Sequence, residues 1–421
     1  MNLKNISKYS KIKGINIVGT GDILHPMWLR QVRTSTHQVS DGLYSLQQDQ
    51  NNIVFILSTE VNLSFMYEQK SKNIHHVLLI PNFEVVEQLC DVLSNYGDLV
   101  VDGRPTLYLS PPEFIELIMS VSHDIFVIPA HIFTPWYSLF GAFSGFDSLK
   151  DCYQDRVHYI KAVETGLSSD PPMNYKLSQL DNLLLVSNSD AHSPYPWRLG
   201  REANILQIKK LSYKSILEAL TPNASSTNKL VGTIEVPPEL GKYHWSGHRT
   251  CGVSFPPEKS LEMNDICPVC GKKMTIGVSE RVELLSDRNE INLKNKPVYY
   301  HLVPFHDILK SLYGFASYYS KQLWEAYYLY VKLFGNEYTL TLFSSESELK
   351  EKLPPKIAKT VLMMRHRKLT LIPGYDGVYG QLKLDFESED DVAPSDRDIK
   401  LRELEKAGPR KSIQSTLNDY F

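Results

Sequence analysis

The chain has 421 residues, of which 42% are hydrophobic and 22% charged, and these values indicate a globular protein of two or three domains. The formal net charge of −3 does not suggest bulk binding of nucleic acid, although an acidic tail can hide a basic groove. No apolar run reaches the ~18 residues that a membrane span needs and no signal peptide opens the chain, so we expect an intracellular, cytoplasmic protein.

Residues 1–205 alternate between strand-like runs and helical or loop segments. The apolar runs cover residues 14–22, 52–60, 75–81, 125–131, 159–166 and 182–192. This alternation predicts an α/β fold of parallel strands wrapped by helices. Five of the runs end in a polar residue, at the strand ends that carry the chemistry in such folds. These residues are Asp22, Glu60, His131, Glu164 and Asp190.

Seven side chains on or beside these runs are potential metal ligands: Asp22, His25, Glu60, His75, His131, Asp190 and His192. Carboxylate oxygens and imidazole nitrogens suit Zn²⁺, Mn²⁺ or Fe²⁺. Asp190 and His192 are two residues apart just past a strand, so they can point to the same side. Each residue alone could be a helix cap or a loop residue, but seven on six successive units predict a joint metal site.

Residues 206–240 are predicted to be a linker, because the composition turns to Pro, Gly, Ser and Asn. Residues 241–280 are predicted to be a zinc-binding module. His248 and Cys251 form one short pair and Cys267 and Cys270 another, and two such pairs can close a tetrahedron around Zn²⁺. His244 is a rival fourth ligand, and three buried free cysteines are the alternative. Because protein atoms fill all four positions, the predicted zinc is structural.

Residues 281–385 are predicted to be mainly helical, with some strand near "NEYTLTLF", and residues 386–421 to be a disordered tail. The chain ends in "QSTLNDYF". Its residues Gln414, Leu417, Tyr420 and Phe421 have the spacing of, and resemble, the motif that binds a sliding clamp (PCNA). One turn of 3₁₀ helix would gather the last three into an apolar plug. An ordinary frayed terminus is the alternative.

Longer motifs carry a further resemblance. "GTGDILHP", "STE", "IHHVLLIP", "PAHIFTPW" and "SNSDAH" resemble the PHP (polymerase and histidinol phosphatase) domain family. "IFTPWYSLFG", "ETGLSSDP", "PWRLGRE", "PGYDGVYG" and the cysteine module resemble the archaeal endonuclease Q family over nearly the whole chain. This implies a PHP-type distorted β/α barrel with two or three divalent metals (Zn²⁺, Mg²⁺ or Mn²⁺). It also implies a monomeric, nucleoid-associated DNA repair endonuclease that nicks 5′ of deaminated bases (uracil, hypoxanthine, xanthine) and abasic sites.

The resemblance assigns roles residue by residue. The metal ligands would be Asp22, Glu60, His75, His131, Asp190 and His192, and His25 matches the family less closely. The residues that take part in catalysis would be Asp22, Glu60, His131, Asp190 and His192. Glu60 would bridge two metals. His75 is preferred to His76, because it precedes its strand by the family's spacing. One metal would activate water, and another would stabilise the leaving 3′ oxygen.

One departure concerns the start of the chain. The family opens with a strand that carries His-x-His, whereas this chain begins "MNLKNISKYSKIKG", which we interpret as the following helix, with the start at an internal Met. Two other functions stay open. A PHP phosphoesterase acting on a small molecule would not need the clamp motif or the extra domains. A catalytically impaired clamp-binding module would explain the missing His-x-His.

Overall fold

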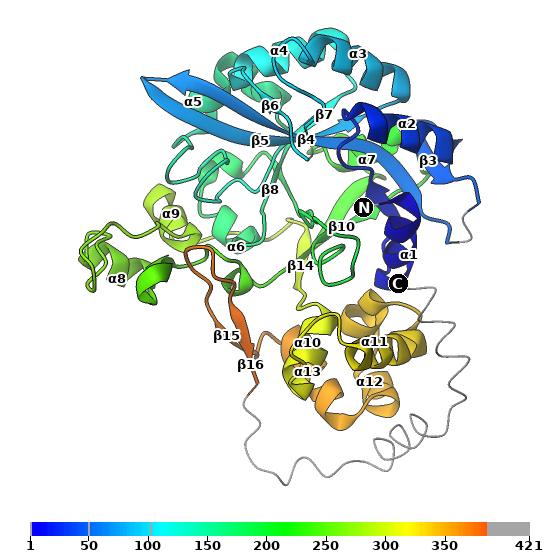
Figure 1. Ribbon diagram of the computed structural model, residues 1–421, viewed down its shortest axis with the longest axis vertical. Helices are drawn as coiled ribbons and strands as arrows, with labels where there is room; N and C mark the ends of the chain where they lie inside the picture. Colours follow the sequence, from blue (N-terminus) through cyan, green and yellow to red (C-terminus); the bar gives the residue numbers. More distant parts are fainter. Residues whose placement is uncertain (1, 49–50, 102, 385–421) are drawn as a thin grey trace.

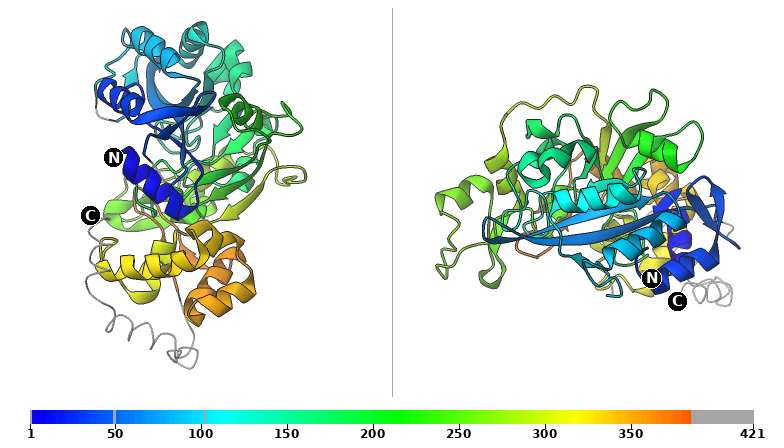
Figure 2. Two further views of the ribbon diagram at one scale, coloured as in Figure 1. Left: turned by 90° about the vertical axis from the view of Figure 1, so that its right-hand side faces the viewer. Right: turned by 90° about the horizontal axis from the view of Figure 1, so that it is seen from above.

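The computed structural model describes residues 2–48, 51–101 and 103–384. Figure 1 shows a sheet with its helices at one end of the long axis and a bundle of helices at the other. Helix α1 (Leu3–Lys13) lies between these two parts in Figures 1 and 2. In the described part of the chain, no helix combines the length and apolar character that crossing a bilayer requires.

Within the described residues, the main sheet has seven strands, in the order β2-β3-β4-β5-β7, with β1 and β6 both paired to β4. Its strands are β1 (Ile17–Gly19), β2 (Thr36–Ser40), β3 (Leu43–Leu46), β4 (Val54–Tyr67), β5 (Lys70–Ile80), β6 (Thr106–Leu107) and β7 (Phe126–Pro129). The helices of this region are α2 (Pro26–Ser35), α3 (Phe83–Leu93) and α4 (Pro111–Val121). All four strand-like runs predicted between residues 14 and 131 are therefore strands.

The pairing of these strands differs from the prediction. β1 and β6 run parallel to β4, but β4 pairs with β5, and β5 with β7, in the antiparallel sense. β4 continues past Glu60 to Tyr67, and the two-residue turn Glu68–Gln69 has φ of 47° and 63°, as a tight hairpin turn requires. Figure 2 shows this long hairpin crossing the molecule. Glu60 consequently lies inside a strand rather than at its end.

The predicted linker, residues 206–240, is instead folded. β8 (Ala162–Glu164) pairs with β9 (Leu184–Val186), and beyond them β11 (Lys229–Glu235) joins β10 (Ala203–Gln207) to β14 (Val298–His301). Helix α7 (Tyr213–Ala219) packs against β10 and β11. The prediction of a linker was wrong because Leu230 and Ile234, among the polar residues of this segment, are buried in the core.

Residues 241–280, the predicted zinc-binding module, form an arm beside the sheet, and the helical bundle follows it in the chain (Figure 1). The arm and its neighbours contain α5 (Leu149–Tyr153), α6 (Pro171–Asn174), β12 (Ser246–His248), β13 (Val253–Phe255), α8 (Pro257–Glu262) and α9 (Val278–Leu285). The bundle and the hairpin after it contain α10 (Phe305–Tyr313), α11 (Lys321–Phe334), α12 (Glu346–Lys352), α13 (Pro355–Arg365), β15 (Thr370–Ile372) and β16 (Gln381–Lys383).

The strand predicted near "NEYTLTLF" is a π-helical turn at Thr339–Phe343. Arg365 donates hydrogen bonds to the carbonyl oxygens of Leu340, Thr341 and Ser344, which satisfies backbone groups that a sheet would otherwise pair. Leu340 is fully buried. Tertiary packing therefore overrides the alternating pattern that suggested a strand.

Helix α1 is locked to the bundle by a buried ion pair. The helix predicted at the start of the chain is present, and Asn2 caps its first turn. At its other end, Lys13 Nζ lies 2.7 Å from Glu337 Oε1, and both side chains are fully buried. Burial lowers the pKa of Lys13, and the nearby Glu337 carboxylate opposes this. One apolar cluster runs from α1 through the sheet to α13, so the parts share a core.

Candidate functional site

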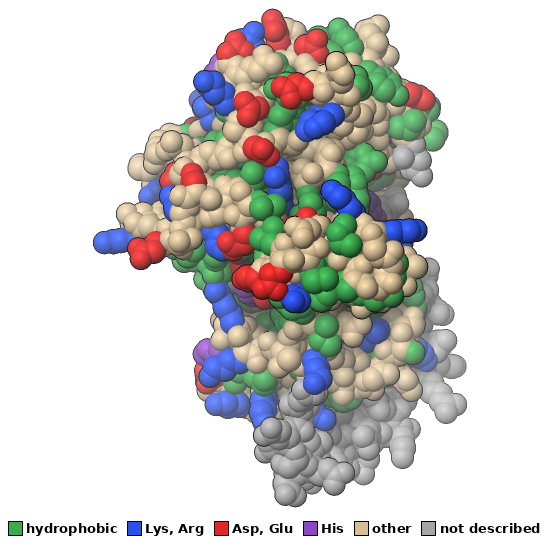
Figure 3. All heavy atoms as spheres, turned by 90° about the vertical axis from the view of Figure 1, so that its left-hand side faces the viewer, with side chains coloured by type: hydrophobic (Ala, Val, Ile, Leu, Met, Phe, Trp, Pro, Cys, Tyr) green, Lys and Arg blue, Asp and Glu red, His purple; other side chains and the backbone are tan. Residues whose placement is uncertain are grey.

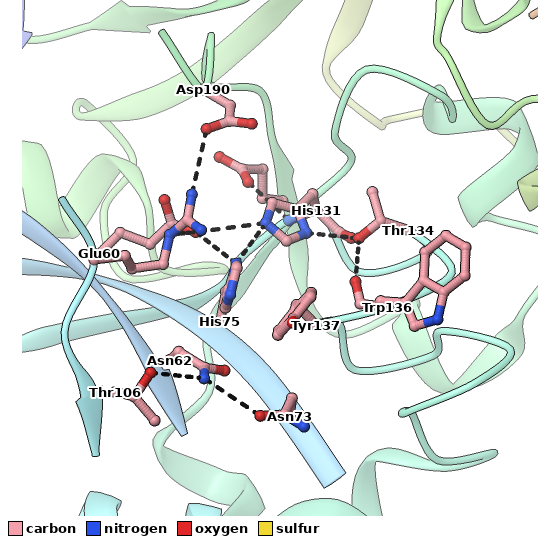
Figure 4. Close-up of polar contacts among 12 residues, drawn as sticks. Glu60, Asn62, Asn73, His75, Thr106, His131, Thr134, Trp136, Tyr137 and Asp190 are labelled. Atoms are coloured by element: carbon pink, nitrogen blue, oxygen red, sulfur yellow. Dashed lines mark hydrogen bonds and ion pairs between the residues drawn. The ribbon is translucent and has the colours of Figure 1, made fainter. Parts of the chain in front are cut away.

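Glu60, His75 and His131 come together on one face of the main sheet (Figure 4). Glu60 and Asn62 point the same way from β4, and His75 on β5 lies opposite Asn62. His131 follows β7, the other neighbour of β5. Glu60 Oε1 lies 3.1 Å from His75 Nδ1 and 3.4 Å from His131 Nε2. The antiparallel pairing therefore gathers three of the predicted ligands.

The structure separates the two adjacent histidines. His75 Nδ1 lies 3.1 Å from His131 Nε2, in the cluster. His76 points to the opposite face, where its Nε2 lies 2.6 Å from the Tyr153 hydroxyl. Burial lowers the pKa of His76 to about 3. His76 is therefore a neutral core residue, whereas His75 faces the candidate site.

The charges in the cluster depend on one another. Burial works against ionisation of Glu60, but hydrogen bonds from His131 and His75 outweigh it and hold the pKa of Glu60 well below its usual range. Burial lowers the pKa of His75 to about 4, whereas contact with Glu60 overcomes burial and raises the pKa of His131. One ligand atom from each residue lies within 4.8 Å of the others, so the three side chains fit a divalent metal.

Thr134 determines which nitrogen of His131 faces the cluster. The Thr134 hydroxyl can donate its one proton to the carbonyl oxygens of His131 (3.2 Å) or Trp136 (3.1 Å). His131 Nδ1, 2.8 Å from this hydroxyl, then donates to the Thr134 oxygen. In the neutral ring Nε2 keeps its lone pair toward Glu60 and His75, as a metal ligand requires.

Asp190 lies at the edge of this cluster, and Arg104 connects it to Glu60. Arg104 Nε is 3.0 Å from Glu60 Oε1, and another guanidinium nitrogen is 3.8 Å from Asp190 Oδ1. His192 Nε2 is 3.6 Å from the same Asp190 oxygen, but the His192 side chain is 79% exposed. Sequence reasoning missed Arg104, because a lone arginine in a loop matches no ligand pattern.

Asp22 and His25 lie outside the three-residue cluster. Asp22 is exposed in the turn before α2. His25 occupies the N-cap position of α2, and its Nε2 lies 3.1 Å from the carbonyl oxygen of Val100. The structure therefore leaves their assignment as ligands a prediction.

Three of the residues predicted for the site have strained backbones. Asp22, His131 and Asp190 have φ of 44°, 31° and 42°, in the left-handed region that costs a non-glycine residue ~1–3 kcal/mol. Gly166 packs against His131 so closely that an added Cβ would lie 2.6 Å from the His131 Cβ. Surrounding contacts must hold these conformations, which is typical of functional sites.

Glu164, predicted as a strand-end residue but not as a metal ligand, contacts the backbone of His131. Its Oε2 accepts a hydrogen bond from the His131 N–H at 2.7 Å, and its Oε1 accepts one from Asn188 at 2.8 Å. Burial raises the pKa of Glu164 to about 7. Two further carboxyl groups are completely enclosed nearby in the fold. Burial raises the pKa of Glu235 to about 8 and that of Glu202 well above its usual range.

His248, Cys251, Cys267 and Cys270 form a second cluster, with one ligand atom from each within 4.8 Å of the others. Cys270 Sγ lies 3.3 Å from His248 Nδ1. Burial opposes ionisation of Cys267, but the backbone N–H groups of Cys270 and Val269 outweigh it and lower the pKa of Cys267 to about 6. His244, the rival ligand, instead lies 3.3 Å from the Ser168 carbonyl oxygen. The four side chains fit a tetrahedral divalent metal.

The predicted clamp-binding residues Gln414, Leu417, Tyr420 and Phe421 lie outside the described residues.

The fold and these two clusters define a mixed α/β protein with two candidate metal sites. No family model matches the chain. An uncharacterized protein of Methanocaldococcus jannaschii is 35% identical over 257 residues. The matched residues are 59% of this chain and only 31% of that protein's length. The uncharacterized protein YqxK of Bacillus subtilis is 29% identical over 383 residues, which cover 89% of this chain and 90% of YqxK.

Two solved structures are similar over nearly the whole chain. The lesion-specific endonuclease PfuEndoQ from Pyrococcus furiosus is 29% identical, with a TM-score of 0.79 and coverage of 93% of this chain and 94% of that one. Endonuclease Q in complex with a 27-mer duplex substrate that has an abasic lesion at the active site is 29% identical, with a TM-score of 0.81 and coverage of 94% of each chain. The chain is an endonuclease Q-like protein.

Proposed function

We propose that this protein is a DNA repair endonuclease that hydrolyses the phosphodiester 5′ of deaminated bases and abasic sites. The observation that carries the proposal is the convergence of Glu60, His75 and His131 in a chain similar over 93–94% of its length to a lesion-specific endonuclease and to its complex with abasic DNA. The catalytic part would be a PHP-type barrel with a multi-metal site. A cluster of one carboxylate and two imidazoles suits metal-assisted hydrolysis of a phosphodiester better than attack by a protein nucleophile.

In this mechanism Glu60, His75 and His131 would hold a divalent metal, and Asp190 would contribute to a neighbouring one. When bound, the metals supply hydroxide near neutral pH and stabilise the leaving 3′ oxygen. Glu164 keeps the His131 backbone in place through its 2.7 Å hydrogen bond. Arg104 adds a permanent positive charge between the two carboxylates, where a phosphate would bind.

Binding of DNA would depend on individual side chains. Basic, acidic and hydrophobic side chains are interspersed on the face that Figure 3 shows. The net charge of −3 agrees with this distribution. The His248–Cys270 cluster would hold a structural zinc, because protein ligands fill all four positions. The end of the chain would bind a sliding clamp.

A panel of duplexes with one uracil, hypoxanthine, xanthine or abasic site, assayed with several divalent metals, tests the proposal. We expect nicking on the 5′ side of the lesion and no nicking of undamaged duplex. Asp190→Asn should abolish nicking and leave DNA binding largely intact, because it removes a charged ligand and no DNA contact. Hydrolysis of a small phosphate ester without nicking of any duplex would favour a small-molecule phosphoesterase instead.

A further inference from the structure

The loop that follows His131, residues 132–146, presents aromatic side chains at the surface. Trp136, Tyr137 and Phe143 are 38%, 47% and 46% exposed. Large aromatic side chains normally bury most of their surface, so three half-exposed rings on one short loop indicate a contact surface. Figure 4 shows Trp136 and Tyr137 on the loop beside His131.

Tyr137 covers one ligand of the candidate metal site. Its ring stacks on the imidazole of His75, with centroids 5.0 Å apart and planes 25° apart. Its backbone has φ of 61°, a conformation unusual for a bulky residue. Two hydrogen bonds hold it there, from the Tyr137 N–H to Ser144 Oγ at 2.8 Å and from the His75 N–H to the Tyr137 carbonyl at 3.0 Å. The strained backbone therefore fixes the ring between His75 and the solvent.

Trp136 lies beside it and is also tied to the cluster. Its ring stacks on Phe143 at 5.0 Å and 17°, and meets Tyr243 of the zinc-module arm edge-on at 5.6 Å. Its carbonyl accepts the Thr134 hydroxyl that also contacts His131. The Thr134 hydroxyl thus joins the Trp136 backbone to His131.

The loop is packed too tightly to rearrange easily. An added Cβ at Gly141 would lie 2.5 Å from the Thr134 carbonyl oxygen, and one at Gly145 would lie 2.3 Å from the Gly141 nitrogen. Backbone hydrogen bonds from Phe140 to Ile132 and from Phe146 to Leu139, both 2.7 Å, close the loop on itself. A rigid aromatic surface binds a flat ligand with little loss of conformational freedom.

We propose that Trp136 and Tyr137 form a stacking surface for a nucleobase of the strand being cut, next to the scissile phosphate. The proposal rests on the proposed function. A phosphodiester at the cluster places the neighbouring base within reach of Tyr137, and a flat, uncharged π face suits any base. Lys242 Nζ, 5.3 Å from the Tyr243 ring centroid, adds positive charge for the backbone of the same strand.

The test is the affinity for a duplex that carries one abasic-site analogue. Its scissile phosphate is replaced by a methylphosphonate, so that binding is measured by fluorescence anisotropy with the metals in place. Trp136→Leu and Tyr137→Leu keep an apolar side chain but remove the π face, and each should weaken binding by about tenfold, since each removes one base-stacking contact. Tyr137→Phe should bind as the parent does. Tyr108→Leu, at a 72% exposed tyrosine on another segment, is the matched control.

A second readout keeps the test valid if a leucine variant folds poorly. Placing 2-aminopurine next to the abasic analogue should give fluorescence that the parent protein quenches on binding and that Trp136→Leu quenches less. Folded leucine variants that bind and quench like the parent would overturn the stacking surface alone. A parent protein that neither binds nor nicks abasic DNA would instead overturn the proposed function.

Discussion

Replacing Lys13 with methionine should strongly destabilise the protein. Lys13 and Glu337 are 2.7 Å apart and fully buried. Glu337 also accepts hydrogen bonds from the Phe305 N–H at 2.9 Å and the Tyr327 hydroxyl at 2.7 Å, so it cannot move to solvent without losing them. Removing one partner of a buried pair typically costs about 3–5 kcal/mol, a large part of a total stability of ~5–15 kcal/mol.

Urea unfolding followed by tryptophan fluorescence measures this loss. The ring centroid of Trp324 lies 5.9 Å from that of Tyr9 on α1, so the emission of Trp324 reports on the interface between α1 and the bundle. The double variant Lys13→Met with Glu337→Gln should recover much of the stability, because no unpaired charge then stays buried. Lys11→Met, at an exposed position of the same helix, should change the midpoint little. If Lys13→Met and Lys11→Met unfold at the same urea concentration, the buried pair does not stabilise the fold as reasoned.

Cys267→Ser should lower the zinc content by one ion per chain and loosen residues 241–280, as elemental analysis and hydrogen exchange would show, and unchanged zinc content would contradict a site there. The pKa of Glu235 is about 8 in the folded protein, above the ordinary value near 4.5. Between these two pH values the folded state keeps a proton that the unfolded state releases, so the stability of the fold falls as the pH rises from ~4.5 to ~8. Glu235→Gln should therefore raise the melting temperature more at pH ~8.5 than at pH ~5.5, and an equal shift at both would refute the burial argument. Tyr420→Ala with Phe421→Ala should abolish heat of binding to the organism's sliding clamp in calorimetry of peptide 408–421, and an unchanged binding heat would leave the motif without a role.

Hydrophobic patterning predicted the strands well but not their directions. The predicted strand ends at Glu60, although the apolar residues Val61, Leu63 and Phe65 continue the alternation. The turn Glu68–Gln69 lacks the Gly or Asn that usually marks a two-residue hairpin turn, so the antiparallel pairing left no local signal.

The two candidate metal sites were predictable to different degrees. The cysteine cluster uses two short pairs, so spacing alone indicates its geometry. Glu60, His75 and His131 come from three strands or strand ends, and residue type suggested them while only the sheet register brings them together. Arg104 was missed because its role arises from a tertiary contact with Glu60.

The pairing of α1 with the bundle has a consequence for synthesis of the chain. Lys13 and Glu337 are separated by 324 residues, so Lys13 leaves the ribosome long before its partner exists. At ~5–20 residues per second, translation of the intervening chain takes roughly 15–65 s. During that interval the amino-terminal helix has an unpaired ammonium group and an uncovered apolar face. Transient binding by a chaperone, or docking delayed until after release, would protect the nascent chain from aggregation in that period.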